Sequence, residues 1–182
     1  MRKANLILRL GRKKLASPAR NRRKKSKRLN GLLAIELLSA ECFFSATPTA
    51  DALVVAGYMA DLALDLQQRG YTAVSVYLDR NTTHLVRMQT AYIQLSQGLS
   101  IQMRFVHFAP YSPALNPVEY VIHWVRQRYL HQADCRQCLA QVKERLMAVL
   151  AHQVVLSQVQ LVNLLVYIEK LVVDKQKHNL SS

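Results

Sequence analysis

Short apolar runs alternate with helix-like segments in the first two thirds of the chain. Four runs predict strands, at residues 32–38, 42–44, 73–79 and 101–105. Residues 49–69 and 83–97 have helical spacing, and each of these segments ends next to a glycine. The order strand, strand, helix, strand, helix, strand predicts an α/β or α+β fold with a mixed sheet.

The last third of the chain has helical periodicity throughout. Helices are expected from Asn116 to Tyr129, over 136–153 and over 157–174. The last two form a leucine-rich C-terminal helical pair that either covers the sheet or meets another protomer. Residues 146–168 carry no formal charge and are long enough to span a bilayer, but six polar side chains within them argue against a membrane span.

Positive charge is concentrated at the beginning of the chain. The 25 Lys and Arg exceed the 11 Asp and Glu, and thirteen of the basic residues lie within residues 2–28, where there is no acid. This distribution excludes an evenly basic enzyme and indicates a nearly neutral body with a basic leader. Such a leader favours a polyanionic partner. Residues 1–30 are therefore predicted to form a basic arm. Its candidate nucleic-acid-binding residues are Arg12, Lys13, Lys14, Arg20, Arg22, Arg23, Lys24, Lys25, Lys27 and Arg28.

The three cysteines, Cys42, Cys135 and Cys138, have no repeated spacing, and the N-terminus lacks the apolar stretch of a secretory signal. These features predict a cytoplasmic protein, associated with the nucleoid if the source is bacterial. His131 precedes Cys135 and Cys138 at a spacing that suits zinc. A fourth candidate ligand is missing nearby, so a structural zinc site is not expected.

Two carboxylates are the strongest candidates for chemistry. Asp79 ends an apolar strand, where it is either a functional group at a sheet crevice or a turn residue. Glu119 follows Asn116 and Pro117, which read as the N-cap and first residue of a helix, with Glu119 completing a capping box. Strand-end and helix-start carboxylates can converge on a divalent cation, and two metals about 4 Å apart clamp a phosphoryl displacement.

The segments around both carboxylates resemble a known family. Residues 109–120, Ala-Pro-Tyr-Ser-Pro-Ala-Leu-Asn-Pro-Val-Glu-Tyr, closely resemble the third acidic motif of DDE transposases of the mariner-like insertion-sequence superfamily. Residues 77–84, Tyr-Leu-Asp-Arg-Asn-Thr-Thr-His, resemble the second acidic motif of that family. The resemblance implies an RNase H-like mixed sheet flanked by helices, with Asp79 and Glu119 as its second and third metal carboxylates.

The same resemblance implies Mg²⁺ or Mn²⁺ as cofactor and DNA as substrate. His84 matches the family pattern and either orients a phosphate or carboxylate near the metals or is simply a polar residue at a helix start. Asn116 is a second candidate for such an orienting role. A second copy of the chain or a full-length transposase protomer is a further expected partner. No association with a membrane is expected.

The chain departs from the family pattern at the first acidic motif. The family carries its first catalytic Asp on the strand before the two strands at 32–46, but residues 1–35 contain no acid, so that first strand is expected to be missing. Glu36 is the first acid available, although the family's strand order would place it one strand away from the metals. Ala114 replaces the usual Asp, and Arg80 stands where Asn commonly follows the second Asp.

These observations predict a domain order and two functions. Residues 1–30 are the basic arm, 31–135 an incomplete RNase H-like DDE catalytic domain, and 136–182 the C-terminal helices. The chain is a transposase, which cleaves DNA and transfers strands, or an inactive truncated remnant of one. The alternative is a non-catalytic nucleic-acid-binding protein with a basic arm, and strand transfer in the presence of metal distinguishes the two.

Overall fold

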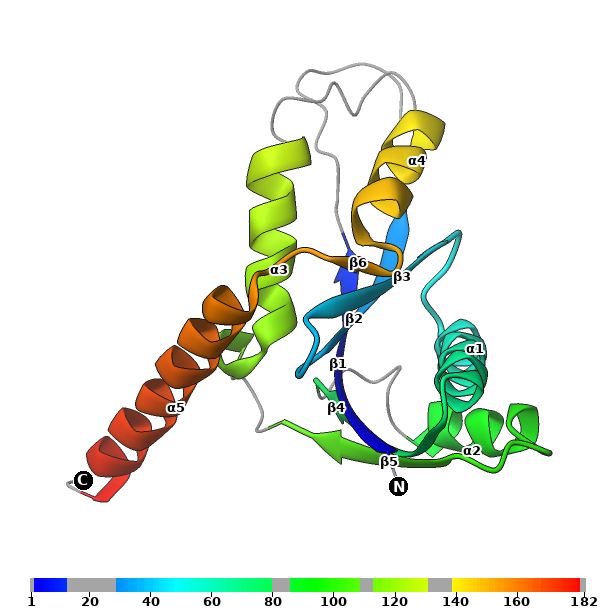
Figure 1. Ribbon diagram of the computed structural model, residues 1–182, viewed down its shortest axis with the longest axis horizontal. Coiled ribbons are helices and arrows are strands. Elements are labelled where there is room, and N and C mark those ends of the chain that lie inside the picture. The colour runs from blue at the N-terminus through cyan, green and yellow to red at the C-terminus, as the bar shows by residue number, and fades with distance from the viewer. Residues whose placement is uncertain (1, 13–28, 80–85, 109–112, 131–138, 181–182) are drawn as a thin grey trace, which may run out of the picture.

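The computed structural model describes residues 2–12, 29–79, 86–108, 113–130 and 139–180 (Figure 1). The strands are β1 (Arg2–Arg12), β2 (Asn30–Glu36), β3 (Glu41–Thr47), β4 (Tyr71–Leu78), β5 (Gln102–His107) and β6 (Gln153–Val154). The helices are α1 (Ala52–Gln68), α2 (Val86–Leu95), α3 (Pro117–Val125), α4 (Leu139–Leu150) and α5 (Gln158–Leu180). A 3₁₀ turn, η2 (Pro113–Leu115), precedes α3, and a π-helical turn, η3 (Arg126–Leu130), continues it.

All these strands form one mixed sheet in the order β5-β4-β1-β2-β3-β6. β1 lies in the middle, parallel to β4 and antiparallel to β2, and β5 continues the parallel half. β3 and β6 extend the antiparallel half. The mixed sheet expected from the sequence is confirmed.

The strand expected to be missing is present. Residues 2–12 were assigned to a basic arm because arginine and lysine flank them, but their centre, Ala4 to Leu8, is apolar apart from one Asn. In the centre of the sheet, the backbone groups on both edges of β1 form hydrogen bonds with β2 and β4. These hydrogen bonds outweigh the unfavourable effect of the flanking arginines and lysines on strand formation. The segment 13–28 lies outside the described residues, and the residues that bracket it, Arg12 and Asn30, are register partners. It is therefore an internal connection between paired strands, not part of a leader that runs from residue 1 to 30.

Helices α1 and α2 cover one face of the sheet. Asp51 caps α1, since its Oδ1 accepts hydrogen bonds from the backbone N–H groups of Leu53 and Val54. Gly70 and Gly98 follow α1 and α2 with φ of +83° and +91°, a left-handed conformation that suits glycine, so the predicted helix ends are confirmed. The core on this side contains Leu32, Ala34, Val74, Val76, Leu78, Val55, Met59, Leu62, Met88 and Tyr92.

Helices α3, α4 and α5 pack on the opposite face. Leu33 and Ile35 of β2 point to this side because successive strand residues alternate between faces. Their buried neighbours are Cys42, Val118, Val121, Val125, Leu150 and Leu161. The C-terminal helical pair therefore packs against its own chain, α4 against β3 and α5 against α3 (Figure 1).

The C-terminal pair differs from expectation at the end of α4. A helix was expected up to residue 153, but α4 ends at Leu150 and β6 begins at Gln153. His152 adopts a left-handed φ of 56°, and its N–H donates to the carbonyl of Cys42 at 2.8 Å. Pairing with the β3 edge therefore ends the helix. Within the described parts of the chain, no helix is long and apolar enough to cross a membrane.

Candidate catalytic site

Asp79 lies where two parallel strands end together. It follows the last residue of β4, Leu78, which pairs with His107, the last residue of β5. The Leu78 carbonyl accepts a hydrogen bond from the N–H of Phe108 at 2.8 Å. Asp79 is half-buried at this carboxyl edge. Ligands of open α/β sheets bind at such an edge, and a metal-binding role for Asp79 there remains a prediction.

Glu119 lies in the first turn of α3. Asn116 is the N-cap and is 2% exposed; its Oδ1 accepts from the N–H of Val118 at 3.1 Å, and its carbonyl accepts from the N–H of Glu119 at 3.0 Å. Pro117 occupies the first helical position, as predicted. The Oδ1 of Asn116 serves the helix cap, and an orienting role near a metal remains a prediction.

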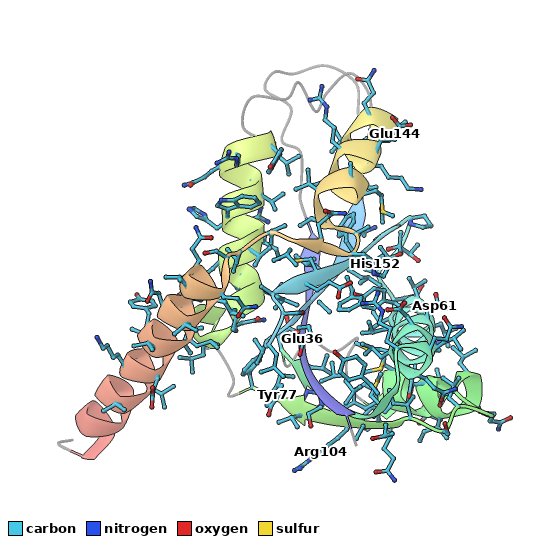
Figure 2. All side chains as sticks on the ribbon, viewed as in Figure 1. Glu36, Asp61, Tyr77, Arg104, Glu144 and His152 are labelled. Atoms are coloured by element: carbon cyan, nitrogen blue, oxygen red, sulfur yellow. The ribbon has the colours of Figure 1, made fainter. Side chains whose placement is uncertain are left out.

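The end of β4 and the start of α3 lie on the same face of the sheet. Tyr77, two residues before Asp79, packs into the cluster that contains Val118 and Val121 of α3 (Figure 2). Its ring also lies 6.0 Å from that of Phe108, centroid to centroid. Both candidate carboxylates are thus close in sequence to residues of this cluster, Asp79 to Tyr77 and Glu119 to Val118.

Glu36 lies on the other face. In β2 it shares the side of Leu32 and Ala34, which pack under α1. It is 3% exposed, and its Oε2 accepts from the backbone N–H groups of Leu38 at 3.2 Å and Ser39 at 2.6 Å. Glu36 therefore stabilises the turn between β2 and β3, and its side chain is separated by the sheet from the α3 face.

The central strand supplies no first carboxylate. β1 reads Arg-Lys-Ala-Asn-Leu-Ile-Leu-Arg-Leu-Gly-Arg and contains neither Asp nor Glu. Leu8 pairs with Leu78, so Arg9 is the next position along β1, beside Asp79. Arg9 also pairs with Leu33, whose side chain lies on the α3 face. Among the described residues, no group of three or more His, Cys, Asp or Glu is arranged to hold a metal.

The loop before α3 is held despite the departure at Ala114. The Tyr120 hydroxyl donates to the Ala114 carbonyl at 3.2 Å, across the 3₁₀ turn η2. Burial raises the pKa of Tyr120, so the hydroxyl stays a donor. Tyr120 also contacts Tyr167 of α5 edge-on at 6.1 Å between ring centroids. This loop is therefore fixed by the residue that follows Glu119.

An arginine-rich turn follows the helix that carries Glu119. Arg126 and Arg128 are exposed in η3, and the Arg128 guanidinium carbon lies 5.8 Å from the Trp124 ring centroid. Trp124 is half-buried against the α3-side cluster and contacts Tyr129 edge-on at 5.5 Å. The sequence analysis did not single out this exposed basic turn, although the Arg-Gln-Arg-Tyr sequence beyond α3 was an available signal.

Several candidates lie outside the described residues. These are His84 and Arg80, the basic positions from Lys13 to Arg28, and the group His131, Cys135 and Cys138. Their proposed roles remain predictions. Arg12, by contrast, is the last residue of β1.

The mixed sheet flanked by helices, with an acid at the end of β4 and another at the start of α3, is the arrangement expected of an RNase H-like DDE domain. A family model described as the DDE superfamily endonuclease matches residues 6–140. The chain belongs to this family. None of the curated proteins matches the sequence closely enough to count as a relative.

Solved structures share the fold at low identity. A pre-cleavage Mos1 transpososome is 15% identical, with a TM-score of 0.60, over 95% of this chain and 55% of that chain. The Mos1 transposase paired-end complex with the left transposon end is 16% identical, with a TM-score of 0.59, over 95% and 55%. A simian T-cell lymphotropic virus intasome, in complex with a PP2A regulatory subunit, is 9% identical, with a TM-score of 0.50, over 86% and 52%.

The chain thus spans about half the length of these structures. The likeness confirms the RNase H-like α/β fold, and the family match confirms the resemblance to DDE transposases.

Proposed function

We propose that this chain is a transposase-type catalytic core that binds DNA but does not cleave or join DNA on its own. One observation carries the proposal. The central strand β1 is present and contains no acid, while Asp79 follows β4 and Glu119 begins α3, where the proposal takes them as the second and third carboxylates. The proposal therefore attributes the missing first carboxylate to the sequence of β1, in which Arg9 occupies the position beside Asp79.

The carboxylates present fit one weakly bound divalent cation. Carboxylate oxygens are the donors that Mg²⁺ and Mn²⁺ prefer, and the proposal takes Asp79, after β4, and Glu119, in the first turn of α3, as such donors. They do not fit a two-metal clamp, because a pair of metals needs a further carboxylate to bridge them. Asp79 and Glu119 are therefore proposed as metal ligands without a complete catalytic site.

The expected loss of rate is large. Removing a ligand that stabilises charge in the transition state costs several kcal/mol, and each 1.4 kcal/mol corresponds to about tenfold in rate. The chain alone should be slower than an intact relative by at least ~10³.

DNA binding is supported by where the positive charge is anchored. β1 runs parallel to β4 and continues beyond the point where β4 ends. Its last residue, Arg12, pairs with Asn30, so the basic segment 13–28 connects two strands at the sheet edge where Asp79 lies. Arg126 and Arg128 add positive charge at the end of α3. A duplex bound by phosphate contacts alone would be held without sequence preference.

The experiment tests both halves of the proposal on the full 182-residue chain. Fluorescence anisotropy with duplex DNA should show binding that weakens steeply with salt. Nicking and strand-transfer assays with Mg²⁺ or Mn²⁺ should show no product. Metal-dependent nicking that is abolished by Asp79→Asn and by Glu119→Gln would overturn the catalytic half, because another residue would then complete the site.

The alternative function is a nucleic-acid-binding protein in which the acidic residues have no role. Asp79→Asn and Glu119→Gln distinguish the two, because a vestigial metal site predicts weak Mn²⁺ binding that both substitutions remove. A purely binding protein predicts no change in either metal or DNA affinity.

A further inference from the structure

The helix that carries Glu119 continues into a rare kind of turn. After α3, Arg126–Leu130 form the π-helical turn η3, and none of its residues is buried (Figure 1). π-Helical turns are uncommon and frequently occur at functional sites. Arg126, Gln127 and Arg128 are all exposed there. The turn therefore presents polar and charged side chains to solvent from an element that the buried residues of α3 hold to the sheet.

The positive charge of this turn is not balanced by an acid. η3 contains two arginines and neither Asp nor Glu, and within the described parts of the chain no ion pair involves Arg126 or Arg128. Arg128 instead lies over Trp124, with its guanidinium carbon 5.8 Å from the ring centroid. An arginine that lies over an aromatic ring and has no carboxylate partner keeps its charge and its flat donor group available to an anionic ligand.

Trp124 is fixed in place below this arginine. Its ring is half-buried against the α3-side cluster, and the Tyr129 ring contacts it edge-on at 5.5 Å between centroids. Gln127 does not compete for the arginine, because its Nε2 lies 2.8 Å from Nε2 of His123. The indole and the guanidinium are thus two flat groups, one over the other, at an exposed turn. We call Trp124 and Arg128 the stacking pair.

Flat groups beside uncompensated positive charge suit single-stranded nucleic acid. Unpaired bases stack on aromatic rings and on arginine guanidinium groups, and nearby cations bind the phosphates of the same strand. In a duplex each base is stacked between its neighbours, so duplex DNA offers η3 its phosphates but not its base faces. An acidic peptide would pair with the arginines but would leave the flat faces of the stacking pair unused.

We propose that the stacking pair binds an unpaired base of single-stranded DNA, while the charge of Arg126 strengthens the attraction of the strand. This inference rests on the proposed DNA binding and names the form of DNA that η3 prefers. The basic segment 13–28 would bind the phosphates of duplex and single strand alike. A preference for unpaired bases is therefore attributed to η3.

The first test uses the fluorescence of Trp124, the single tryptophan of the chain. Titration of the full chain with a short oligo(dT) strand should quench this fluorescence, because a base stacked on the pair changes the surroundings of the indole. Oligo(dT) paired with oligo(dA), and an abasic strand of the same length, should bind in an anisotropy assay with little quenching. Equal quenching by all three ligands, or bound oligo(dT) without quenching, would overturn the proposal.

The second test keeps the charge and removes the flat group. Arg128→Lys should weaken binding of oligo(dT) about tenfold and leave duplex affinity nearly unchanged, since stacking contributes only to the single strand. Arg145→Lys, at an exposed arginine of α4, is the matched control and should change neither affinity. Trp124→Leu should also remove the preference, and circular dichroism should show that this variant remains folded. An Arg128→Lys chain that still prefers oligo(dT) would show that Arg128 binds only phosphate, contrary to the proposal.

The outcomes separate this inference from the proposed function. A chain that binds duplex DNA and has no preference for the single strand retains the proposed DNA binding and loses the stacking site. Quenching by oligo(dT) in a chain that does not bind duplex supports the stacking pair and contradicts the duplex binding. If oligo(U) quenches Trp124 at a lower concentration than oligo(dT) does, the pair binds RNA, and its assignment to DNA is overturned.

Discussion

The Arg69 guanidinium joins the end of α1 to the edge of the sheet through Glu41. Its Nη1 lies 2.8 Å from both carboxylate oxygens of Glu41, and its Nη2 lies 3.0 Å from Asp65 and 2.9 Å from Nδ1 of His152. His152 packs edge-on against Phe43, at 5.5 Å between ring centroids. Through these contacts α1, β3 and the turn before β6 share one polar cluster, which ties the C-terminal helices to the sheet.

Arg69→Met should destabilise the fold by about 1 kcal/mol. The guanidinium is partly exposed, so solvent screening reduces what the Glu41 pair contributes, while the packing of its stem is largely kept by Met. Urea unfolding followed by circular dichroism measures the change in the free energy of unfolding. Arg104→Met, at an exposed position on β5, is the control and should have almost no effect. An equal decrease in the free energy of unfolding for the two variants would mean that the Arg69 cluster makes no specific contribution to stability.

Asp51 should make stability depend on pH. Hydrogen bonds from the backbone N–H of Val54, and then from Thr49 and Leu53, hold the pKa of this carboxyl below its ordinary value of 3.8. The group binds protons less readily in the folded state, so its contribution is complete above pH 3.8 and is lost as pH falls through the lower folded-state pKa.

Asp51→Asn should keep the helix cap and lose this part of the pH dependence, whereas Asp51→Ala should lose both. Thermal unfolding between pH 2 and 6, compared among the three chains, measures the difference. A wild-type profile identical in shape to that of Asp51→Asn would contradict the assignment.

Arg9→Asp should create the carboxylate that the metal site lacks. The substitution places an acid on β1 at the position beside Asp79, so Mn²⁺ affinity should rise at least about tenfold, equivalent to roughly 1.4 kcal/mol. Isothermal titration with Mn²⁺ measures it, and circular dichroism checks that β1 still forms. Arg2→Asp, at the opposite end of the same strand, controls for the change in charge. If Arg2→Asp gains as much affinity, or if Asp79→Asn leaves the gain intact, position 9 does not contribute to the metal site.

The basic segment 13–28 should carry most of the DNA affinity. Because Arg12 pairs with Asn30, the segment and Leu29 can be replaced by Asn-Gly, a two-residue hairpin turn, without removing β1. The shortened chain should bind duplex DNA at least about 100-fold more weakly at low salt, with a shallower dependence of log affinity on log salt.

The matched control keeps the length of the segment and changes its nine Lys and Arg to Gln, which should have the same effect. Undiminished binding by both variants would assign the DNA surface to Arg126 and Arg128 instead.

The sequence predicted the elements whose signals are local. Apolar spacing and terminal glycines predicted α1, β4 and α2. Asn116 and Pro117 predicted the start of α3. It did not predict β1, because arginines and lysines mask a short apolar centre that becomes a strand only between two neighbours. The contacts of Arg69 with Glu41 and His152 were equally hidden, since they join residues 28 and 83 positions apart. Which face Glu36 occupies depends on register, and register appears only once the strands are paired.

Arg12, at the end of β1, pairs with Asn30, at the start of β2, so the basic segment between them is attached to the sheet at both ends. A free tail would sample a large volume, whereas a segment joined to the sheet at both ends can reach no further from it than its own length allows, and this segment contains nine Lys and Arg. Any duplex that this loop captures is then presented to the sheet at an effective concentration set by loop length, on the order of millimolar. Once the loop holds a duplex, further weak contacts to the same DNA, from a metal ion at Asp79 or from the end of α3, would be intramolecular. They would therefore increase the overall affinity for DNA. If the proposed function holds, a core that performs no chemistry would still bind DNA in competition with an intact enzyme.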